Sequence, residues 1–597
     1  MDYHFKSVWK GWLIMKKYNR FILFMVTLLS CALLSFGCSQ KTPKANPDTF
    51  DALLNDMFTK QVKQDTLTLN YSLAHPENFG ITDPVISLGH YTIEDMKKSL
   101  IDAENNLALL NNYDYDSLTK DQQLTYDILK ESLTLEMSSG NMLLYHEILG
   151  PTTGLQAQLP VLLAEYNFYT KEDIDTYIKL LPKIYDYFEE ISAFERLKSE
   201  AGLFMSDKVA DNIIDQCSHF IAQTEDNYLI EIFNDKISSY EGLTEIEIKS
   251  YKVANKNAVL NDIIPAYQLL IQTLTDLKGS GKNEGGLSNF PKGKEYYEYL
   301  FRSNTGSSRP ISEIITMLDT SLATNLVTLN SLMTKDTNVY EEAAALSYPL
   351  TDPVEILEYL KSAIKKDFPE CPEVKYNVKY VHKSLQEHLS PAMYLVPAID
   401  NYKNNIIYIN KNPDYNLDQI FNTLAHEGYP GHLYQAVYFR NTNPSPIRSL
   451  LDFGGYAEGW ATYVEFYSYS LAGFSGNLAA FMEANMAANM ALYCRLDIGI
   501  NYEGWTISDT AAYLKDFGLT KSATVDLLYT TMIEEPALYP QYGIGYLEFM
   551  ELKKTAKEGL MDNFNLKDFH KFLLDIGPAQ FDIIADRMDL WMKEQNK

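Results

Sequence analysis

The sequence predicts a mainly α-helical protein of two lobes with a small antiparallel sheet. Three observations support this fold class. Apolar residues recur at helical spacing from about residue 47 to 276, the glycine-rich segment 278–286 interrupts the pattern, and helical spacing then resumes. In the second half, apolar and polar residues alternate over 373–382, which is the period of a half-buried strand. We therefore expect an N-terminal helical lobe over 48–280 and a C-terminal lobe over 281–597.

The first 37 residues have the features of a secretory signal peptide. Three basic residues lie between positions 16 and 20, an apolar run follows over 21–37, and Cys38 opens a polar stretch. A basic segment, an apolar segment and a small residue before the cleavage point define such signals. The Gly-Cys junction also resembles a bacterial lipobox, which predicts cleavage before Cys38 and attachment of a lipid to it. Residues 38–47 would then form a tether.

Two alternatives at the N-terminus stay open. The apolar run of about 17 residues is at the short limit for a membrane span, so an uncleaved anchor is the rival to a cleaved signal. Translation can also start at Met15 instead of Met1, because residues 1–14 add nothing that a signal needs. A cleaved and lipidated signal and an uncleaved anchor would both place the protein outside the cytoplasm and attach it to a membrane.

In the N-terminal lobe, one helix start is particularly clear. Thr170 is a suitable N-cap, and Asp173 three residues later completes the pattern of a capping box. An apolar stripe at helical spacing follows, and it consists of Ile174, Tyr177, Ile178, Leu181, Ile184, Tyr185 and Phe188. Such a stripe predicts a face buried in the core and not a ligand site.

The C-terminal lobe contains the predicted strands. Besides 373–382, strand-like segments occur at 394–396 and 405–410, directly before the most informative motif of the chain. An edge strand in that place can bind an extended peptide by strand addition. A purely structural sheet explains the pattern equally well.

Composition excludes some classes of function. The net charge of −28 argues against nucleic-acid binding, because phosphate groups require a basic surface. An acidic chain suits a soluble protein outside the cytoplasm. Beyond residue 38, the cysteines Cys217, Cys371 and Cys494 are odd in number and far apart, so no disulfide framework is predicted.

The segment HEGYPGH at 426–432 carries the strongest chemical signal. Neutral imidazoles are common zinc ligands, and a glutamate beside a ligand can act as a general base. His426 and His432 are six residues apart, however, so a regular helix would place them on different faces. The Pro-Gly pair before His432 predicts a distortion between the two histidines that restores a common direction. Glu427 is then the candidate base.

A third metal ligand is predicted downstream. Catalytic zinc usually has three protein ligands, and two histidines with one glutamate form a known set. Glu458 follows His426 by 32 residues, in a segment of small and aromatic residues that predicts burial. Glu465 lies seven residues further, on nearly the same helix face. One of these carboxylates would bind the metal, and the other would orient a histidine ligand; we predict Glu458 as the ligand.

The motifs HEGYPGH and EGWATYVE together resemble the bacterial family catalogued as domain of unknown function 885. The resemblance covers most of the mature chain, and the family is similar to the gluzincin peptidases, which are mostly helical zinc enzymes. Shorter matching stretches begin at Gly293, Ser390, Tyr408, Asp497 and Tyr542. One position departs from the pattern: Asn501 stands where the family usually has a histidine.

The resemblance implies a two-lobed metallopeptidase fold and a complete site. One zinc ion per chain would be held by His426, His432 and Glu458. Glu427 would accept a proton from the attacking water, and Tyr542 would stabilise the oxyanion of the tetrahedral intermediate. The substrates would be short or extended peptides.

Two other functions stay open at this level. The chain could be an inactive peptide-binding lipoprotein that keeps the peptidase fold, for which Asn501 is the warning sign. It could also be a zinc hydrolase of a non-peptide amide.

Overall fold

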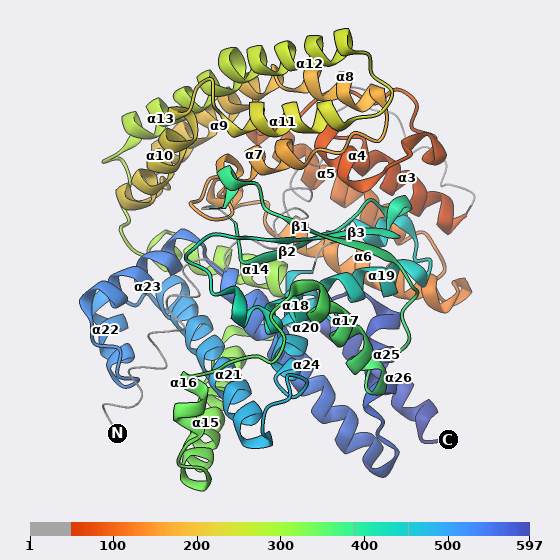
Figure 1. Cartoon of the computed structure of the whole chain (residues 1–597), viewed down its shortest axis with the longest axis vertical. Coiled ribbons are helices and arrows are strands. Elements are labelled where there is room, and N and C mark those ends of the chain that lie inside the picture. The colour runs from red at the N-terminus through yellow and green to blue at the C-terminus, as the bar shows by residue number, and fades with distance from the viewer. Residues whose placement is uncertain (1–48, 387–388, 452) are drawn as a thin grey trace.

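The computed structural model describes residues 49–386, 389–451 and 453–597. The predicted signal peptide, Cys38 and the tether lie outside the described residues. Within the described ranges, no helix combines the length and the apolar character that a membrane crossing requires. The fold is mainly helical with one small sheet, as predicted (Figure 1).

The helices before the glycine-rich segment form two groups, each around its own core. The first group is α3 (Phe50–Val62), α4 (Thr66–Ser72), α5 (Ile93–Leu110) and α6 (Lys120–Ser138). The second is α7 (Leu155–Glu165), α8 (Lys171–Leu180), α9 (Lys183–Glu200), α10 (Asp207–Ala222), α11 (Tyr228–Ser239), α12 (Glu245–Ala258) and α13 (Ile264–Leu277). Figure 1 shows the second group as a layer above the sheet. The lobe boundary near residue 280 stays a prediction.

The predicted capping box is present, but the stripe behind it spans two helices. The backbone N–H of Thr170 donates to the Asp173 carboxylate at 2.7 Å, and α8 begins at the next residue. Helix α8 ends at Leu180 and α9 begins at Lys183, because Pro182 lacks the amide hydrogen that a continuous helix needs. Ile174 from α8 and Phe188 from α9 are both fully buried in the core, as the stripe predicts.

The sheet is mixed and not wholly antiparallel. Its order is β1 (Lys375–Tyr380), β3 (Asn404–Ile409), β2 (Ala392–Leu395). β1 pairs with β3 in parallel, and only β2 and β3 are antiparallel. The 23 residues that separate β1 from β3 in sequence include β2. They return the chain to the end of the sheet at which β1 begins, so β3 can run in the same direction as β1.

The sheet separates two cores. Met393 and Tyr408 face the core of the α7–α13 layer, whereas Tyr394 and Ile407 face the core of the C-terminal helices. Successive side chains of a strand point to opposite faces, so each strand contributes to both cores. The sheet therefore lies between the α7–α13 layer and the C-terminal helices (Figure 1).

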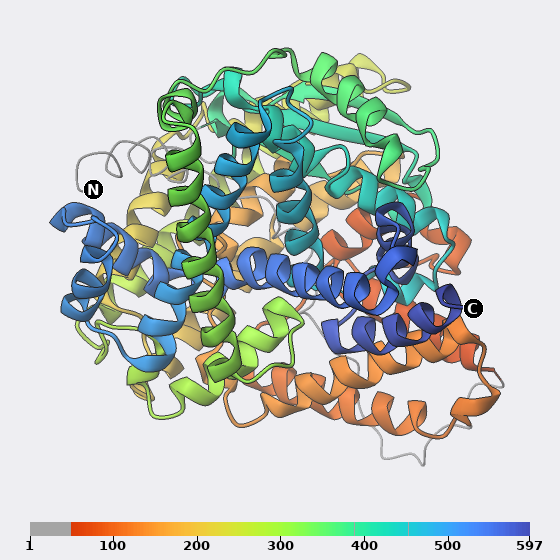
Figure 2. The same cartoon turned by 90° about the horizontal axis from the view of Figure 1, so that it is seen from below.

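The remaining helices pack beneath the sheet. They are α14 (Gly293–Thr305), α15 (Ile311–Lys335), α16 (Val339–Ala344), α17 (Pro353–Ala363), α18 (Phe421–Glu427), α19 (His432–Asn441), α20 (Gly454–Ser468), α21 (Gly476–Ile498), α22 (Ile507–Lys515), α23 (Ser522–Glu534), α24 (Leu538–Leu560), α25 (Leu566–Ile576) and α26 (Phe581–Gln595). The C-terminal helix α26 lies beside α6, where Arg587 pairs with Asp127 (Figure 2).

Helices α20 and α24 pack so closely that glycine is required where they cross. A Cβ atom on Gly459 would lie 2.3 Å from the carbonyl carbon of Gly545, and one on Gly545 would lie 2.1 Å from the carbonyl oxygen of Gly455. Backbone atoms cannot yield as a flexible side chain can, so larger residues would force the helices apart. This contact sets the position of α20, the helix that carries Glu458.

Replacing Gly459 by alanine is expected to destabilise the protein by about 1–3 kcal/mol, the usual cost of overpacking. Gly476→Ala in α21 is the matched control, because a Cβ atom on Gly476 would have no other atom within 4 Å. Thermal unfolding of both variants tests the contact. Equal melting temperatures for the two variants would show that α20 and α24 are not in tight contact.

Candidate metal centre

The HEGYPGH segment forms the end of one helix, a turn and the start of another. α18 ends at Glu427 and α19 begins at His432, with a cis peptide bond between Tyr429 and Pro430 in the turn. The predicted distortion is therefore a complete break, and not a bulge within one helix. The indole nitrogen of Trp460 donates a hydrogen bond of 2.9 Å to the Pro430 carbonyl and fixes the turn.

The break restores the common direction of the two histidines. The N–H of Gly431 donates to the carbonyl of Ala425 at 2.9 Å, and the N–H of Tyr434 donates to that of Gly428 at 3.1 Å. Each bond spans six residues where a helix spans four, so two extra residues are looped out. His432 consequently occupies the place, relative to His426, of a residue four positions later.

Glycine is required at the centre of this turn. A Cβ atom on Gly431 would lie 1.7 Å from the carbonyl oxygen of His426. Any other residue would push the two helix ends apart and separate the histidines. The turn thus explains why the motif tolerates a spacing that a regular helix would forbid.

His426, His432 and Glu458 converge at one buried point. Their potential ligand atoms all lie within 4.8 Å of one another. Nε2 of His426 lies 3.3 Å from Oε2 of Glu458, and Nε2 of His432 lies 3.4 Å from Oε1. Tetrahedral ligands about 2.1 Å from an ion are about 3.4 Å apart, so these spacings fit a metal ion.

The hydrogen bonding of the three side chains also fits a metal. The Nε2 atoms of both histidines and both carboxylate oxygens of Glu458 are buried without a hydrogen-bond partner among the described residues. Buried polar atoms are normally satisfied, and an ion is one way to satisfy a group of electron-pair donors. This geometry brings together the three residues that the sequence predicts as ligands.

Glu465 contacts the first of these histidines from behind. Its Oε2 lies 3.0 Å from Nδ1 of His426, on the side of the ring opposite Nε2. Such a contact fixes the tautomer and the orientation of the imidazole, so that Nε2 is left free to bind an ion. Glu458 and Glu465 both belong to α20, two turns apart.

Glu427 lies beside this group, and one of its oxygens is held by a backbone amide. Its side chain is 0% exposed, and Oε2 accepts a hydrogen bond of 2.8 Å from the backbone N–H of Tyr394. Oε1 has no partner among the described residues. Burial raises the pKa of Glu427 to about 7, although the neighbouring His426 and His432 rings oppose the rise. A carboxyl group with a pKa near neutrality is suited to accept and return a proton.

The amide of Tyr394 is a contributor that no sequence pattern indicates. β2 is an edge strand, so the N–H of Tyr394 can reach Glu427 instead of a neighbouring strand. Residues 390–394 stand out in the sequence only through the family resemblance. A backbone donor leaves no mark on residue type, so the sequence carries no direct signal of its role.

Tyr542 lies near the metal group. It belongs to α24 and is half-buried. Burial raises the pKa of its phenol well above the usual value, and the nearby carboxylates of Glu458 and Glu427 raise it further. The phenol therefore keeps its proton and can donate it in a hydrogen bond.

Asn501 has a structural position. Its Oδ1 accepts from the backbone N–H of Leu287 at 3.1 Å, and its Nδ2 donates to the carbonyl of Met532 at 2.8 Å. The side chain is fully buried and joins the segment before α14 to α23. Both ends of the amide are engaged away from the three converging side chains.

Comparison with known proteins identifies the family. A family model described as bacterial protein of unknown function (DUF885) matches residues 78–588. The chain belongs to this family. A search of curated proteins finds no match.

Several solved structures match this chain, including the following three. A "putative lipoprotein" from Colwellia psychrerythraea is 18% identical with a TM-score of 0.79, and the match covers 91% of this chain and 99% of that one. A "putative lipoprotein of unknown function" from Shewanella oneidensis is 16% identical with a TM-score of 0.64, covering 91% and 100%. A "putative oligoendopeptidase F" from Bacillus anthracis is 12% identical with a TM-score of 0.30, covering 85% and 97%.

Proposed function

We propose that this DUF885 protein is a zinc-dependent peptidase that acts outside the cytoplasm. The observation that carries the proposal is the convergence of His426, His432 and Glu458 beside the buried carboxyl group of Glu427. Two imidazoles and one carboxylate suit zinc, and three protein ligands leave a coordination position for reaction chemistry. Zinc held there would supply Lewis acidity that polarises a carbonyl group and acidifies water.

Protein residues transfer the proton, stabilise the oxyanion and orient a metal ligand. Glu427 accepts the proton of the attacking water through Oε1, its unpaired oxygen, while the Tyr394 amide holds Oε2 in place. Glu427 then returns the proton to the leaving amine. Tyr542 donates a hydrogen bond to the carbonyl oxygen as negative charge develops on it. Glu465 keeps the His426 ring in the orientation that metal binding requires.

The edge strand β2 supports a peptide as the substrate. Its position at the edge of the sheet leaves backbone groups that an extended chain can pair with. The contact from Tyr394 to Glu427 ties that edge to the proposed base. A peptide paired with β2 would therefore pass beside the groups that cleave it.

The test of this function is cleavage of a mixed peptide library by the zinc-loaded mature protein. Metal analysis of the same sample gives the zinc content, for which we expect about one ion per chain. Zinc binding together with hydrolysis of non-peptide amides alone would identify an amidase. Peptide binding without cleavage at full zinc occupancy would identify a binding lipoprotein.

Replacing Tyr542 by phenylalanine is expected to lower kcat by about 10²-fold or more with little change in KM. The removed hydrogen bond forms to the oxyanion and not to the ground-state carbonyl. Steady-state kinetics on a peptide that the library identifies measures both constants. Tyr546→Phe, one turn further along α24, is the control. A rise in KM at unchanged kcat would instead assign Tyr542 to substrate binding.

We also propose that a lipid at Cys38 anchors the enzyme to the membrane. The basic and apolar segments before Cys38 support this, as do relatives named as lipoproteins. Replacing Cys38 by serine is expected to abolish lipidation and prevent normal processing. Mass spectrometry of the N-terminus and membrane fractionation check the outcome. An intact N-terminus ahead of Cys38 in the unaltered protein would favour an uncleaved anchor.

A further inference from the structure

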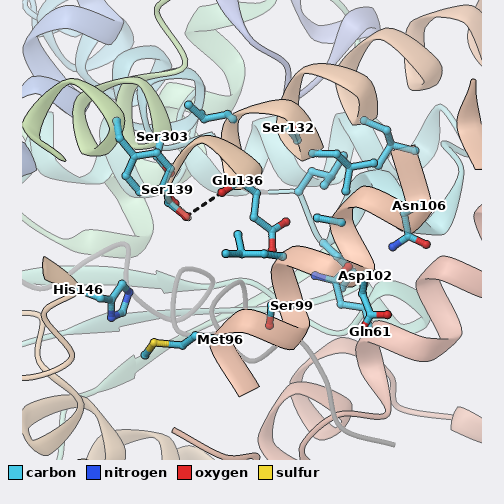
Figure 3. Close-up of a pocket in the computed structure, with 18 of the residues that line it drawn as sticks. Gln61, Met96, Ser99, Asp102, Asn106, Ser132, Glu136, Ser139, His146 and Ser303 are labelled. Atoms are coloured by element: carbon cyan, nitrogen blue, oxygen red, sulfur yellow. Dashed lines mark hydrogen bonds between the residues drawn. The ribbon is translucent and has the colours of Figure 1, made fainter. Parts of the chain in front are cut away.

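A cavity of about 340 Å³ lies among helices that are not part of the metal centre (Figure 3). Helices α3, α5, α6 and α14 line it, together with η10 (Pro446–Ser449) and Phe453. Its volume is within the range of pockets that bind small molecules. Its apolar wall includes Met57, Leu100, Leu129, Leu133, Ile447 and Leu450.

Two carboxyl groups enter this cavity, and neither forms an ion pair within the described ranges. Asp102 extends from α5 and Glu136 from α6, as Figure 3 shows. The side chain of Glu136 forms neither a hydrogen bond nor an ion pair within the described ranges. Burial, together with the charge of Asp102, raises the pKa of Glu136 to about 7. The two groups therefore repel each other across the cavity.

The other titratable groups of the wall do not neutralise this pair. Lys60 forms an ion pair of 2.6 Å with Asp56, and Arg302 one of 2.7 Å with Glu131. Burial lowers the pKa of His146 to about 4, so its ring is uncharged at neutral pH. Lys98 and Lys60 oppose the rise in the pKa of Asp102, whereas no positive charge among the described residues offsets that of Glu136.

Further polar atoms of the wall lack a hydrogen-bond donor. Oδ2 of Asp102 and Oε1 of Gln580 are buried acceptors without a partner among the described residues. Gln580 is only 5% exposed, and its Nε2 donates to Ser132 at 3.0 Å, so its oxygen is fixed in place. A buried acceptor of this kind costs folding free energy unless a donor forms a hydrogen bond to it. In the part of the chain that the structure describes, only Gln64 contributes an unpaired buried donor to the wall.

We propose that this cavity binds an organic ammonium group carried on an apolar stem. An ammonium group offers three donors and one positive charge, which match the acceptors and the two carboxyl groups. The aromatic rings of Tyr91, Tyr296 and Tyr299 in the wall suit a cation, and the aliphatic wall suits the stem. A bare divalent ion would fill little of the cavity and would leave the apolar wall without a contact.

The cavity is connected to the metal centre through one helix. Phe453 lines the cavity and is the N-cap of α20, five residues before Glu458. Five helical residues correspond to about 7–8 Å along the axis. Because the cavity and the metal centre share this helix, the amino end of a peptide substrate is one possible source of the ammonium group. A free amine is the other source, and the experiment must distinguish the two.

The experiment measures binding directly and so does not depend on peptidase activity. Hexylammonium is titrated into the mature Glu427→Gln protein by calorimetry, with 1-hexanol as the neutral counterpart and calcium chloride as the bare cation. We expect hexylammonium to bind and hexanol and calcium not to bind. Glu136→Gln and Asp102→Asn should each weaken hexylammonium binding at least tenfold. Glu104→Gln, an exposed carboxylate on α5, is the matched control and should change nothing.

A second arm identifies the source of the ammonium group. A tripeptide with a free amino end is compared with its N-acetylated form in the same Glu427→Gln protein. Binding of the free form alone assigns the cavity to the amino end of a peptide, and binding of hexylammonium without either peptide assigns it to a free amine. Equal binding of hexanol and hexylammonium, calcium binding in place of the amine, or unchanged affinity in variants that melt normally would each overturn the proposal.

Discussion

Replacing Glu427 by glutamine is expected to lower peptide hydrolysis by about 10²-fold or more while leaving the zinc content unchanged. Glutamine keeps the size of the side chain and its hydrogen bond with the Tyr394 amide. It cannot accept a proton, so only the chemical step should suffer. Cleavage of the peptide library and metal analysis, performed on the same zinc-loaded samples, separate the two effects.

The control for this variant is Asp418→Asn, an exposed carboxylate shortly before α18. It should retain full activity and full zinc content. If Glu427→Gln cleaves peptides as fast as the unaltered protein, another group is the base. If neither protein cleaves peptides but both bind them with zinc in place, the peptidase proposal is wrong.

The pH dependence of activity provides an independent check. Burial raises the pKa of Glu427 to about 7 in the metal-free protein, and a bound dication would favour the carboxylate and lower that pKa. The base form predominates above this pKa, so activity should rise with pH, reach half its maximum at or below about pH 7, and level off about one pH unit higher. This rise of activity with pH should be absent from the residual activity of Glu427→Gln. If the variant and the unaltered protein have the same pH profile of activity, the rise belongs to another titrating group.

The residues of the candidate metal centre could be selected from the sequence because residue type carries their chemistry. Two histidines and a downstream glutamate are ligand types, and the seven-residue spacing of Glu458 and Glu465 placed both on one helix face. The six-residue spacing of His426 and His432 required a distortion, which the Pro-Gly pair predicted. Its form, two helices joined by a turn, depends on hydrogen bonds that no spacing rule contains.

Features set by the backbone or by distant packing were not accessible in this way. The contact of the Tyr394 amide with Glu427 involves a group that every residue except proline possesses. The direction of β1 relative to β3 depends on the path of the connecting chain and not on the alternation that predicts a strand. Asn501 was a warning sign in the sequence, and the structure shows both ends of its amide engaged in joining neighbouring segments.

Replacing Glu458 by glutamine is expected to lower zinc affinity by more than about 100-fold, whereas Glu465→Gln should lower it by about 10- to 100-fold. Glu458 directs both oxygens toward the two histidines, at 3.3 and 3.4 Å from their Nε2 atoms, and is 0% exposed. An amide has no negative charge to offset that of the ion. Glu465 contacts only the far side of the His426 ring, so its loss frees the ring without removing a ligand.

Competition for zinc with a chelator of known affinity measures these differences, and circular dichroism confirms that each variant is folded. Glu551→Gln, a carboxylate on the surface of α24, is the control and should bind zinc normally. His426→Ala and His432→Ala should lose the metal as Glu458→Gln does, because each removes one of three ligands. If Glu465→Gln loses zinc and Glu458→Gln retains it, the roles of the two glutamates are reversed. Metal retention in all four variants would mean that the ion binds elsewhere.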